Sequence, residues 1–339
     1  MLNENAHKNF TACGDAEAEA LLEKVLAEIG TALSGTALSV VLGGSYGRGD
    51  GGVRQDKENG VLYNDLDFFV FAREKSESNR PLLKEISQKY EHQLKVDVDF
   101  GAVMGISDIK KNAPRLMMQE LKRGYRMVCG EDLLEEYLPE LPAEEIPFSE
   151  ACRLLLNRGM GLLLAAEEIA ANSGNMDFIL RNINKAILGA CDAFLIAGNN
   201  YKWNILDRLT AVNDSELSDN CKKLYARALE FKRSPSRELP PDLKAQWCAG
   251  RDMFKECMVL ICGDDCAGLS RRCGESGEIS LMNFIKYCVK SRSLPCRNWR
   301  FYTLPGVAVL AKEVFRALEK ALEKPVSKSK LYQQWLIFN

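Results

Sequence analysis

The chain has 339 residues and a formal net charge of −2, and its apolar runs are all shorter than the ~20 residues of a membrane-spanning helix. This length suggests roughly two or three domains with a substantial core. The weak acidity argues against a nucleic-acid-binding protein, and the N-terminus lacks the layout of a signal peptide, so we expect a soluble cytoplasmic protein without a membrane partner.

The first third of the chain reads as alternating helices and strands. Apolar residues at helical spacing behind an aspartate predict a helix over 15–33. The runs LSVVL, DLDFFVF and LKVDVDF predict three strands, the first of which ends in the glycine-rich turn GGSYGRGD. A helix with proline in its first turn is predicted over 81–93. PRLMMQELKRGYRMVCG predicts a further helix and a short strand that ends at Gly130.

The rest of the chain is predicted to be helical. Three prolines in EYLPELPAEEIPF indicate a linker out of the first domain, and helical periodicity begins at Ser149. A second break, KRSPSRELPPD at 232–242, divides the helical part. We therefore expect an α+β fold with a catalytic domain over residues 1–138, a helical domain over 148–231 and a further helical region over 243–339.

Two pairs of aspartates accompany the second and third predicted strands, Asp65 with Asp67 and Asp97 with Asp99. In a strand, residues i and i+2 point to the same face with Cα atoms roughly 6.5 to 7 Å apart, so each pair can present two carboxylates on one side. Converging carboxylates attract hard cations, and Mg²⁺ typically takes one or two carboxylates together with phosphate oxygens. The pattern predicts a site for metal and nucleotide phosphate.

The histidine content supports chemistry based on carboxylates. The chain has only two histidines, His7 and His92. Histidine is the commonest general base, so its scarcity argues against Ser-His-Asp or Cys-His catalysis and against His-rich zinc sites.

The turn Gly43-Gly44-Ser45, the acids Asp65 and Asp67, and a third acid at Asp97 or Asp99 together resemble the DNA polymerase β-type nucleotidyltransferase superfamily. Its pattern is a strand, a Gly-Gly or Gly-Ser turn, an acidic-x-acidic strand and a third acidic strand. The resemblance covers about residues 36 to 130 and implies that superfamily's sheet with flanking helices. The nineteen residues between Ser45 and Asp65 exceed the number in many relatives, which leaves the substrate open.

The resemblance implies transfer of an NMP from an NTP to a hydroxyl, assisted by two Mg²⁺ ions ~3.5 to 4 Å apart. Asp65 and Asp67 would ligate both ions, and the third aspartate would bind the ion that activates the acceptor. Glycines in the turn allow backbone N–H groups to approach the β- and γ-phosphates, and Ser45 adds a hydroxyl donor. Arg48 is either a bidentate partner of the triphosphate or a surface arginine.

Residues 47–52, GRGDGG, also fit the G-x-G-x-x-G pattern of dinucleotide-binding folds. That mechanism requires a helix that opens at the last glycine and binds the pyrophosphate. The following residues, VRQDKENGVLYN, instead contain an Asn-Gly turn signal and little helical period. We therefore assign no dinucleotide site here.

The later part of the chain offers further features. Lys185, Asp192 and Tyr201 resemble a Lys, an Asp-Ala pair and a Tyr in the helical domains of some bacterial small nucleotidyltransferases. Lys185 and Asp192 are seven residues apart and share a helix face, so one could contact phosphate and the other, with Tyr201, lie near the acceptor. A structural ion pair is the alternative interpretation.

The chain contains twelve cysteines, which we expect to be reduced thiols rather than disulfides. The densest group lacks the CxxC spacing of zinc and most iron–sulfur sites, so we expect buried thiols there: Cys257, Cys262, Cys266 and Cys273. Residues 285–302 mix basic and aromatic side chains. We interpret this stretch as a helix end with aromatic anchors, with a polyanion groove as the alternative.

We therefore expect an Mg²⁺-dependent nucleotidyltransferase whose partners are an NTP and a hydroxyl acceptor, most simply a small metabolite, sugar or aminoglycoside-like molecule. Protein nucleotidylation of the AMPylation type and synthesis of a nucleotide second messenger are alternatives within this class. A catalytically silent regulator that binds nucleotide is the alternative outside it. Retention of Asp65, Asp67 and a third acid argues against silence, because clustered charges are costly.

Overall fold

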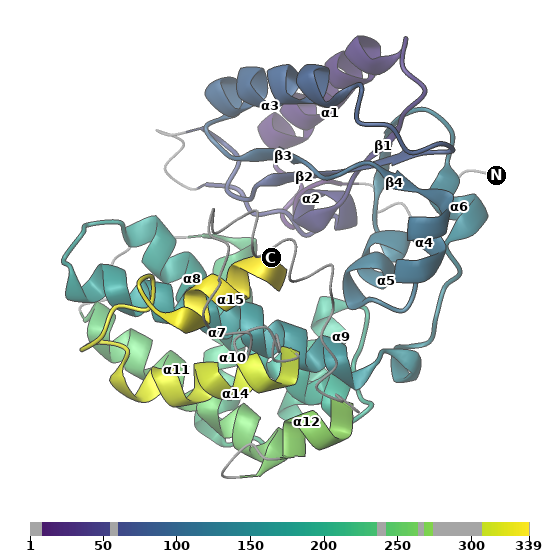
Figure 1. Cartoon of the computed structure of the whole chain (residues 1–339). Helices are drawn as coiled ribbons and strands as arrows, with labels where there is room; N and C mark the ends of the chain where they lie inside the picture. The colour runs from purple at the N-terminus through teal and green to yellow at the C-terminus, as the bar shows by residue number, and fades with distance from the viewer. Residues whose placement is uncertain (1–8, 55–59, 236–241, 264–267, 274–306, 339) are drawn as a thin grey trace, which may run out of the picture. The chain divides into compact units, whose positions relative to one another are not determined.

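The computed structural model describes residues 9–54, 60–235, 242–263, 268–273 and 307–338 (Figure 1). Contacts divide the chain into two compact units, one of Met1–Glu145 with Glu230–Arg237 and the other of Ile146–Leu229 with Glu238–Asn339. The stretches predicted as two helical regions, 148–231 and 243–339, therefore fall into one unit, except for a short segment that belongs to the first unit.

The first unit contains a five-stranded mixed sheet with the order β3-β2-β1-β5, in which β4 also pairs with β2. Strand β1 runs antiparallel to β2 and β5, whereas β3 and β4 run parallel to β2. The architecture is a mixture of helices and sheet, consistent with the α+β class. The strands are β1 (Ser39–Leu42), β2 (Leu66–Ala72), β3 (Val98–Phe100), β4 (Met104–Gly105) and β5 (Arg126–Cys129).

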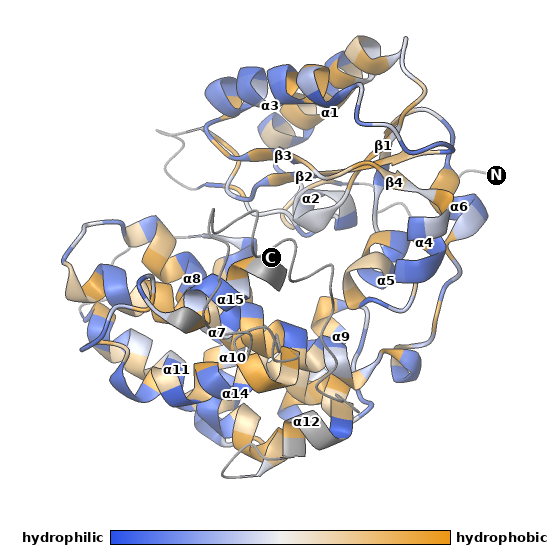
Figure 2. Cartoon of the chain, in the orientation of Figure 1, coloured by the Kyte–Doolittle hydropathy of each residue, from blue (hydrophilic) through white to orange (hydrophobic). Residues whose placement is uncertain are grey.

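One face of the sheet is covered by α1 (Ala16–Leu33) and α3 (Arg80–Leu94) (Figure 1). Alternate strand residues such as Val40, Phe68 and Val98 join the apolar sides of these helices in one core. Figure 2 shows hydrophobic residues along the sheet and hydrophilic residues on the outer sides of both helices. Helix α1 begins after Asp15, whose carboxylate accepts a hydrogen bond from the N–H of Ala18 at 3.0 Å.

The opposite face is covered by α4 (Ile106–Asn112), α5 (Leu116–Arg123) and α6 (Leu133–Tyr137). Their apolar residues pack with Val41 and Phe71 of the sheet in a second core. A one-turn helix, α2 (Gly44–Arg48), follows β1 where the sequence predicts a loop. The five residues of α2 hold a single turn, so no helical repeat exists from which it could have been predicted.

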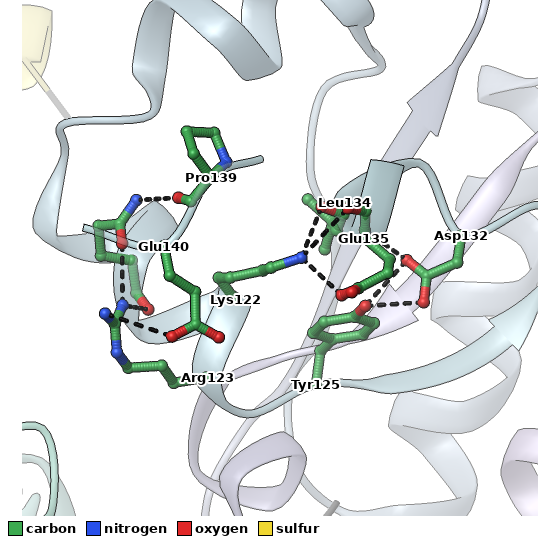
Figure 3. A network of polar contacts seen from close by, with 9 residues as sticks. Lys122, Arg123, Tyr125, Asp132, Leu134, Glu135, Pro139 and Glu140 are labelled. Atoms are coloured by element: carbon green, nitrogen blue, oxygen red, sulfur yellow. Dashed lines mark hydrogen bonds and ion pairs between the residues drawn. The ribbon is translucent and has the colours of Figure 1, made fainter. Parts of the chain in front are cut away.

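A polar network joins α5, the residue before β5 and α6 (Figure 3). The buried Lys122 ammonium donates to the carbonyl of Leu134 at 3.0 Å and to the carboxylate of Glu135 at 2.6 Å. The hydroxyl of Tyr125 donates to Asp132 at 2.7 Å. Arg123 donates to the carbonyl of Leu141 at 2.5 Å, so the predicted linker after residue 138 is held against α5 before the short turn η1 (Ala143–Glu145).

The second unit is helical throughout its described residues. The glycines of α7 allow close packing, because a Cβ at Gly159 would meet the ring of Phe254 at 3.0 Å. The indole N–H of Trp247 donates to the carbonyl of Leu162 at 2.8 Å, which joins α11 to α7. The elements are α7 (Phe148–Ala170), α8 (Met176–Ala197), α9 (Ile205–Asn213), α10 (Asp219–Arg233), α11 (Leu243–Cys262), α12 (Gly268–Cys273), α14 (Val307–Ala317), η3 (Leu318–Lys320) and α15 (Lys330–Phe338).

None of the helices in the described residues of either unit combines the length and the apolar character needed to cross a bilayer.

Candidate functional site

The glycine turn at the end of β1 lies directly on the first acidic strand. The N–H of Gly43 donates to the backbone carbonyl of Asp67 at 2.9 Å. Gly44 has a φ of +61°, and a Cβ built on it would collide with the carboxylate of Asp67. A Cβ on Gly43 would meet Leu121 of α5 at 2.7 Å. Both positions therefore require glycine, and the backbone of the turn lies against the carboxylate of Asp67.

Asp67 and Asp99 are register partners on the parallel strands β2 and β3, and both side chains are exposed. Neighbouring strands lie about 4.8 Å apart, so the two carboxylates emerge side by side from one face. On the other face, Phe68 and Phe100 stack with ring centroids 4.6 Å apart. The apolar neighbours thus anchor the strands and direct the acids outward.

Asp65 and Asp97 precede these strands instead of lying within them. The N–H of Leu66 donates to the carbonyl of Asp97 at 2.8 Å, which extends the pairing of β2 and β3 back to this level. Asp65 is half-buried and Asp97 is exposed. The pairs predicted from sequence therefore form two levels, with Asp67 and Asp99 at the level of the glycine turn and Asp65 and Asp97 one step earlier.

Among the residues that the structure describes, no set of three or more His, Cys, Asp or Glu side chains is arranged to hold a metal ion. The described geometry therefore does not contain the expected convergence of three aspartates on one ion. What it contains is a pair of neighbouring carboxylates, Asp67 and Asp99, of which Asp67 lies against the Gly43-Gly44 turn.

Arg48, predicted either to bind triphosphate or to lie on the surface, takes part in a charge network. Its guanidinium lies 3.8 Å from Asp50 and 3.7 Å from Glu120, and the Asp50 carboxylate also accepts from Lys232 at 2.5 Å. The side chain of Arg48 is 22% exposed. Asp50, Glu120 and Lys232 were not predicted, because their proximity depends on the packing of α5 and the end of α10 around α2.

Ser45 is the residue of the turn that enters α2. It is half-buried, and its carbonyl accepts from the N–H of Asp50 at 3.0 Å. This bond turns the chain back after α2, so Ser45 and Asp50 are neighbours. The predicted role of the Ser45 hydroxyl as a phosphate donor stays a prediction.

In the second unit, Asp192 is part of a buried ion pair. Its Oδ2 accepts from the guanidinium of Arg208 at 2.8 Å, and the side chains of Asp192 and Arg208 are 15% and 6% exposed. The same guanidinium lies 5.0 Å from the ring centroid of the buried Tyr201. Burial raises the pKa of the neighbouring Tyr225, and the charge of Asp192 raises it further. This environment favours the structural interpretation of Asp192 and Tyr201.

Lys185 lies on the same face of α8 as Asp192 by sequence spacing, but the two residues are separated along the helix axis. Seven residues of helix correspond to about 10 Å along the axis between Lys185 and Asp192. Lys185 itself is half-buried. The shared helix face therefore does not by itself bring the two side chains together, and the phosphate-binding role of Lys185 stays a prediction.

The described cysteines are free thiols. Cys257 is buried, and its contact with Cys191 together with burial raises the pKa of the Cys191 thiol. Burial raises the pKa of the Cys221 thiol to about 12. Cys266 and the basic-aromatic stretch 285–302 lie outside the described residues, so the predictions made for them stay predictions.

No protein-family model, curated protein or solved structure matches this chain.

Proposed function

We propose that the chain is an Mg²⁺-dependent nucleotidyltransferase that transfers an NMP from an NTP to a hydroxyl acceptor. The observation that carries this proposal is the contact of the Gly43-Gly44 turn with Asp67, together with the register pairing of Asp67 and Asp99. A phosphate-binding turn and a pair of carboxylates are the parts that phosphoryl chemistry requires next to each other.

The donor set suits Mg²⁺. Carboxylate oxygens are the hard ligands that this ion prefers, and it usually takes one or two of them and completes its shell with water and phosphate oxygens. Asp67 and Asp99 would supply this pair, with Asp65 as a further carboxylate just before β2. When bound, Mg²⁺ neutralises phosphate charge and lowers the pKa of a coordinated hydroxyl.

The glycine turn, Ser45 and Asp99 have separate proposed roles in phosphate and metal binding. The absence of side chains at Gly43 and Gly44 lets the turn lie directly against Asp67, and backbone N–H groups of such glycine turns are donors that suit phosphate. Ser45 adds a hydroxyl at the same turn. Asp99 is the better candidate for the third acid than Asp97, because it stands beside Asp67 at the level of the turn.

We propose a small molecule as the acceptor. The chain has a net charge of −2, which provides no general attraction for a nucleic acid acceptor.

The test is incubation of the protein with each α-labelled NTP, Mg²⁺ and a metabolite extract, followed by mass spectrometry. We expect a small molecule that is heavier by one NMP and the release of pyrophosphate. Label on the protein itself or on a partner chain would favour protein nucleotidylation, and a dinucleotide would favour second-messenger synthesis. NTP binding without any transfer would contradict the proposed enzyme and favour the silent regulator.

A further inference from the structure

Tyr46 is a fully buried residue of α2 whose hydroxyl binds three separate points of the following loop. The hydroxyl donates to the carbonyl of Gly52 at 2.8 Å and accepts from the N–H groups of Tyr63 at 3.0 Å and Asn64 at 3.2 Å. One donor and two acceptor positions are the full capacity of a tyrosine hydroxyl, so each of them is used here.

The two ends of this loop are also bonded to each other. The side-chain carbonyl of Asn64 accepts from the N–H of Gly52 at 2.7 Å. Gly51 lies against the ring of Tyr46 so closely that a Cβ there would collide with it. We call the Tyr46 hydroxyl, the backbone of Gly52 and Tyr63, and Asn64 the Tyr46 clamp.

The Tyr46 clamp connects the two ends of the long segment between Ser45 and Asp65. Nineteen residues separate Ser45 from Asp65, and such an insertion could by itself leave the turn and the acidic strand loosely connected. Tyr46 follows Ser45 directly, and Asn64 precedes Asp65 directly. A bond between Tyr46 and Asn64 therefore fastens the residue after the turn to the residue before the first acid.

The same loop is fastened from a second direction by the segment 230–235 of the first unit. Lys232 binds the carboxylate of Asp50 at 2.5 Å, and the ring of Phe231 packs edge-on against Tyr63 with centroids 5.9 Å apart. These contacts lie at both ends of the loop, so the clamp is enclosed by packed residues. A buried hydrogen bond in such a setting restrains position more strongly than an exposed one.

We propose that Tyr46 is a positioning residue for the transfer reaction, and that its hydroxyl sets the place of Asp65 relative to the Gly43-Gly44 turn. This inference rests on the proposed function. The turn already holds Asp67 through the bond from Gly43 to the Asp67 carbonyl. Through its bond to Asn64, Tyr46 also fixes the position of Asp65, so that Asp65 and Asp67 keep one geometry with respect to bound phosphate.

The test compares Tyr46→Phe with the matched control Tyr90→Phe. Tyr90 is also buried in the first unit, and its hydroxyl donates to Glu28 at 2.7 Å, but this bond joins α3 to α1 away from the turn. Each variant loses one buried hydroxyl and keeps its ring. The measured quantities are the Mg²⁺ concentration for half-maximal transfer, kcat, and the urea midpoint of unfolding.

We expect Tyr46→Phe to raise the half-maximal Mg²⁺ concentration about tenfold and to lower kcat about 10- to 100-fold, because a small misplacement of a reacting group has effects of this size. Saturating Mg²⁺ should restore part of the rate. Tyr90→Phe should leave the half-maximal Mg²⁺ concentration and kcat within about twofold of wild type, even if it lowers the urea midpoint as much as Tyr46→Phe does.

A second variant covers the possibility that Tyr46→Phe does not fold. Asn64→Ala removes the bond to Gly52 from the other end of the clamp and keeps the Tyr46 hydroxyl. It should shift the Mg²⁺ requirement in the same direction. If the wild type is active and both variants keep its Mg²⁺ requirement, only the positioning role is overturned; an inactive wild type overturns the proposed function and the inference with it.

Discussion

Gly44 and Asp67 are in direct contact, because the α-carbon of the turn residue faces the carboxylate with no space for a side chain between them. The backbone of Gly44 is also left-handed, with a φ of +61°. Gly44→Ala should therefore displace the carboxylate or the turn and lower NMP transfer by at least about 100-fold. Initial rates at saturating NTP check this.

The matched control is Gly35→Ala. Gly35 lies in the same unit, and a Cβ there would meet nothing within 4 Å. This variant should keep the activity of wild type. An active Gly44→Ala variant would show that the turn does not have to approach Asp67 for the reaction.

Removal of one carboxylate charge at Asp67 should abolish turnover and leave the fold intact. Asp67 is exposed, so Asp67→Asn leaves no buried polar group without a partner. We expect transfer to fall by at least ~100-fold and the binding of NTP to lose its dependence on Mg²⁺. Calorimetry with and without EDTA measures the second effect. NTP affinity that EDTA does not change in the wild type would contradict the metal site.

The register of β2 and β3 predicts that the two aspartates of the third strand are not equivalent. Asp99 stands beside Asp67, whereas Asp97 lies one step earlier and precedes β3. Asp99→Asn should therefore lower kcat by at least ~100-fold with little change in NTP affinity, and Asp97→Asn should lower it much less. Steady-state kinetics of both variants decide the question. Equal and mild effects would mean that this strand supplies no essential acid.

The ion pair of Asp192 and Arg208 should matter for stability. Arg208→Ala leaves the carboxylate of Asp192 without this cation in a largely buried place, which should lower the free energy of unfolding by about 3 to 5 kcal/mol. Urea denaturation checks this. The exposed pair of Arg316 and Glu313 is the control, and Arg316→Ala should cost no more than about 0.5 kcal/mol.

A variant at the other end of the pair tests the interpretation of Asp192 itself. Asp192→Asn should lower stability in proportion to the loss of the pair and leave NMP transfer by the folded fraction unchanged. A loss of NMP transfer without a loss of stability would support the alternative interpretation, in which Asp192 lies near the acceptor.

The thiols should differ strongly in reactivity. Thiolate is the reactive form, and the pKa of Cys221 is raised to about 12 by burial, so this thiol stays protonated at pH 8. Cys13 is exposed. Iodoacetamide at pH 8 should therefore label Cys13 well before Cys221 and Cys191. Peptide mass spectrometry over a time course follows this, and early labelling of Cys221 would contradict the described packing of α10.

The longer helices and most strands of the first unit could be predicted from local patterns, because their signals are contained in short stretches of chain, whereas the short helices α2, α4 and α6 were not predicted. The aspartate before α1, the proline in the first turn of α3 and the apolar runs of β1 to β3 all act within a few residues. The i, i+2 spacing of Asp65 and Asp67 likewise predicted that the two carboxylates could lie on one side of the chain. These features depend on backbone geometry, which neighbouring residues determine.

Tertiary structure alone decided which of these residues meet. The pairing of Asp67 with Asp99 depends on a parallel register between strands some thirty residues apart, and a shift of one residue would have turned one acid to the other face. The Tyr46 clamp depends on a loop closing on itself, and the bond of Asp192 to Arg208 on the packing of α8 against α9. Such contacts join residues distant in sequence, so no local pattern records them.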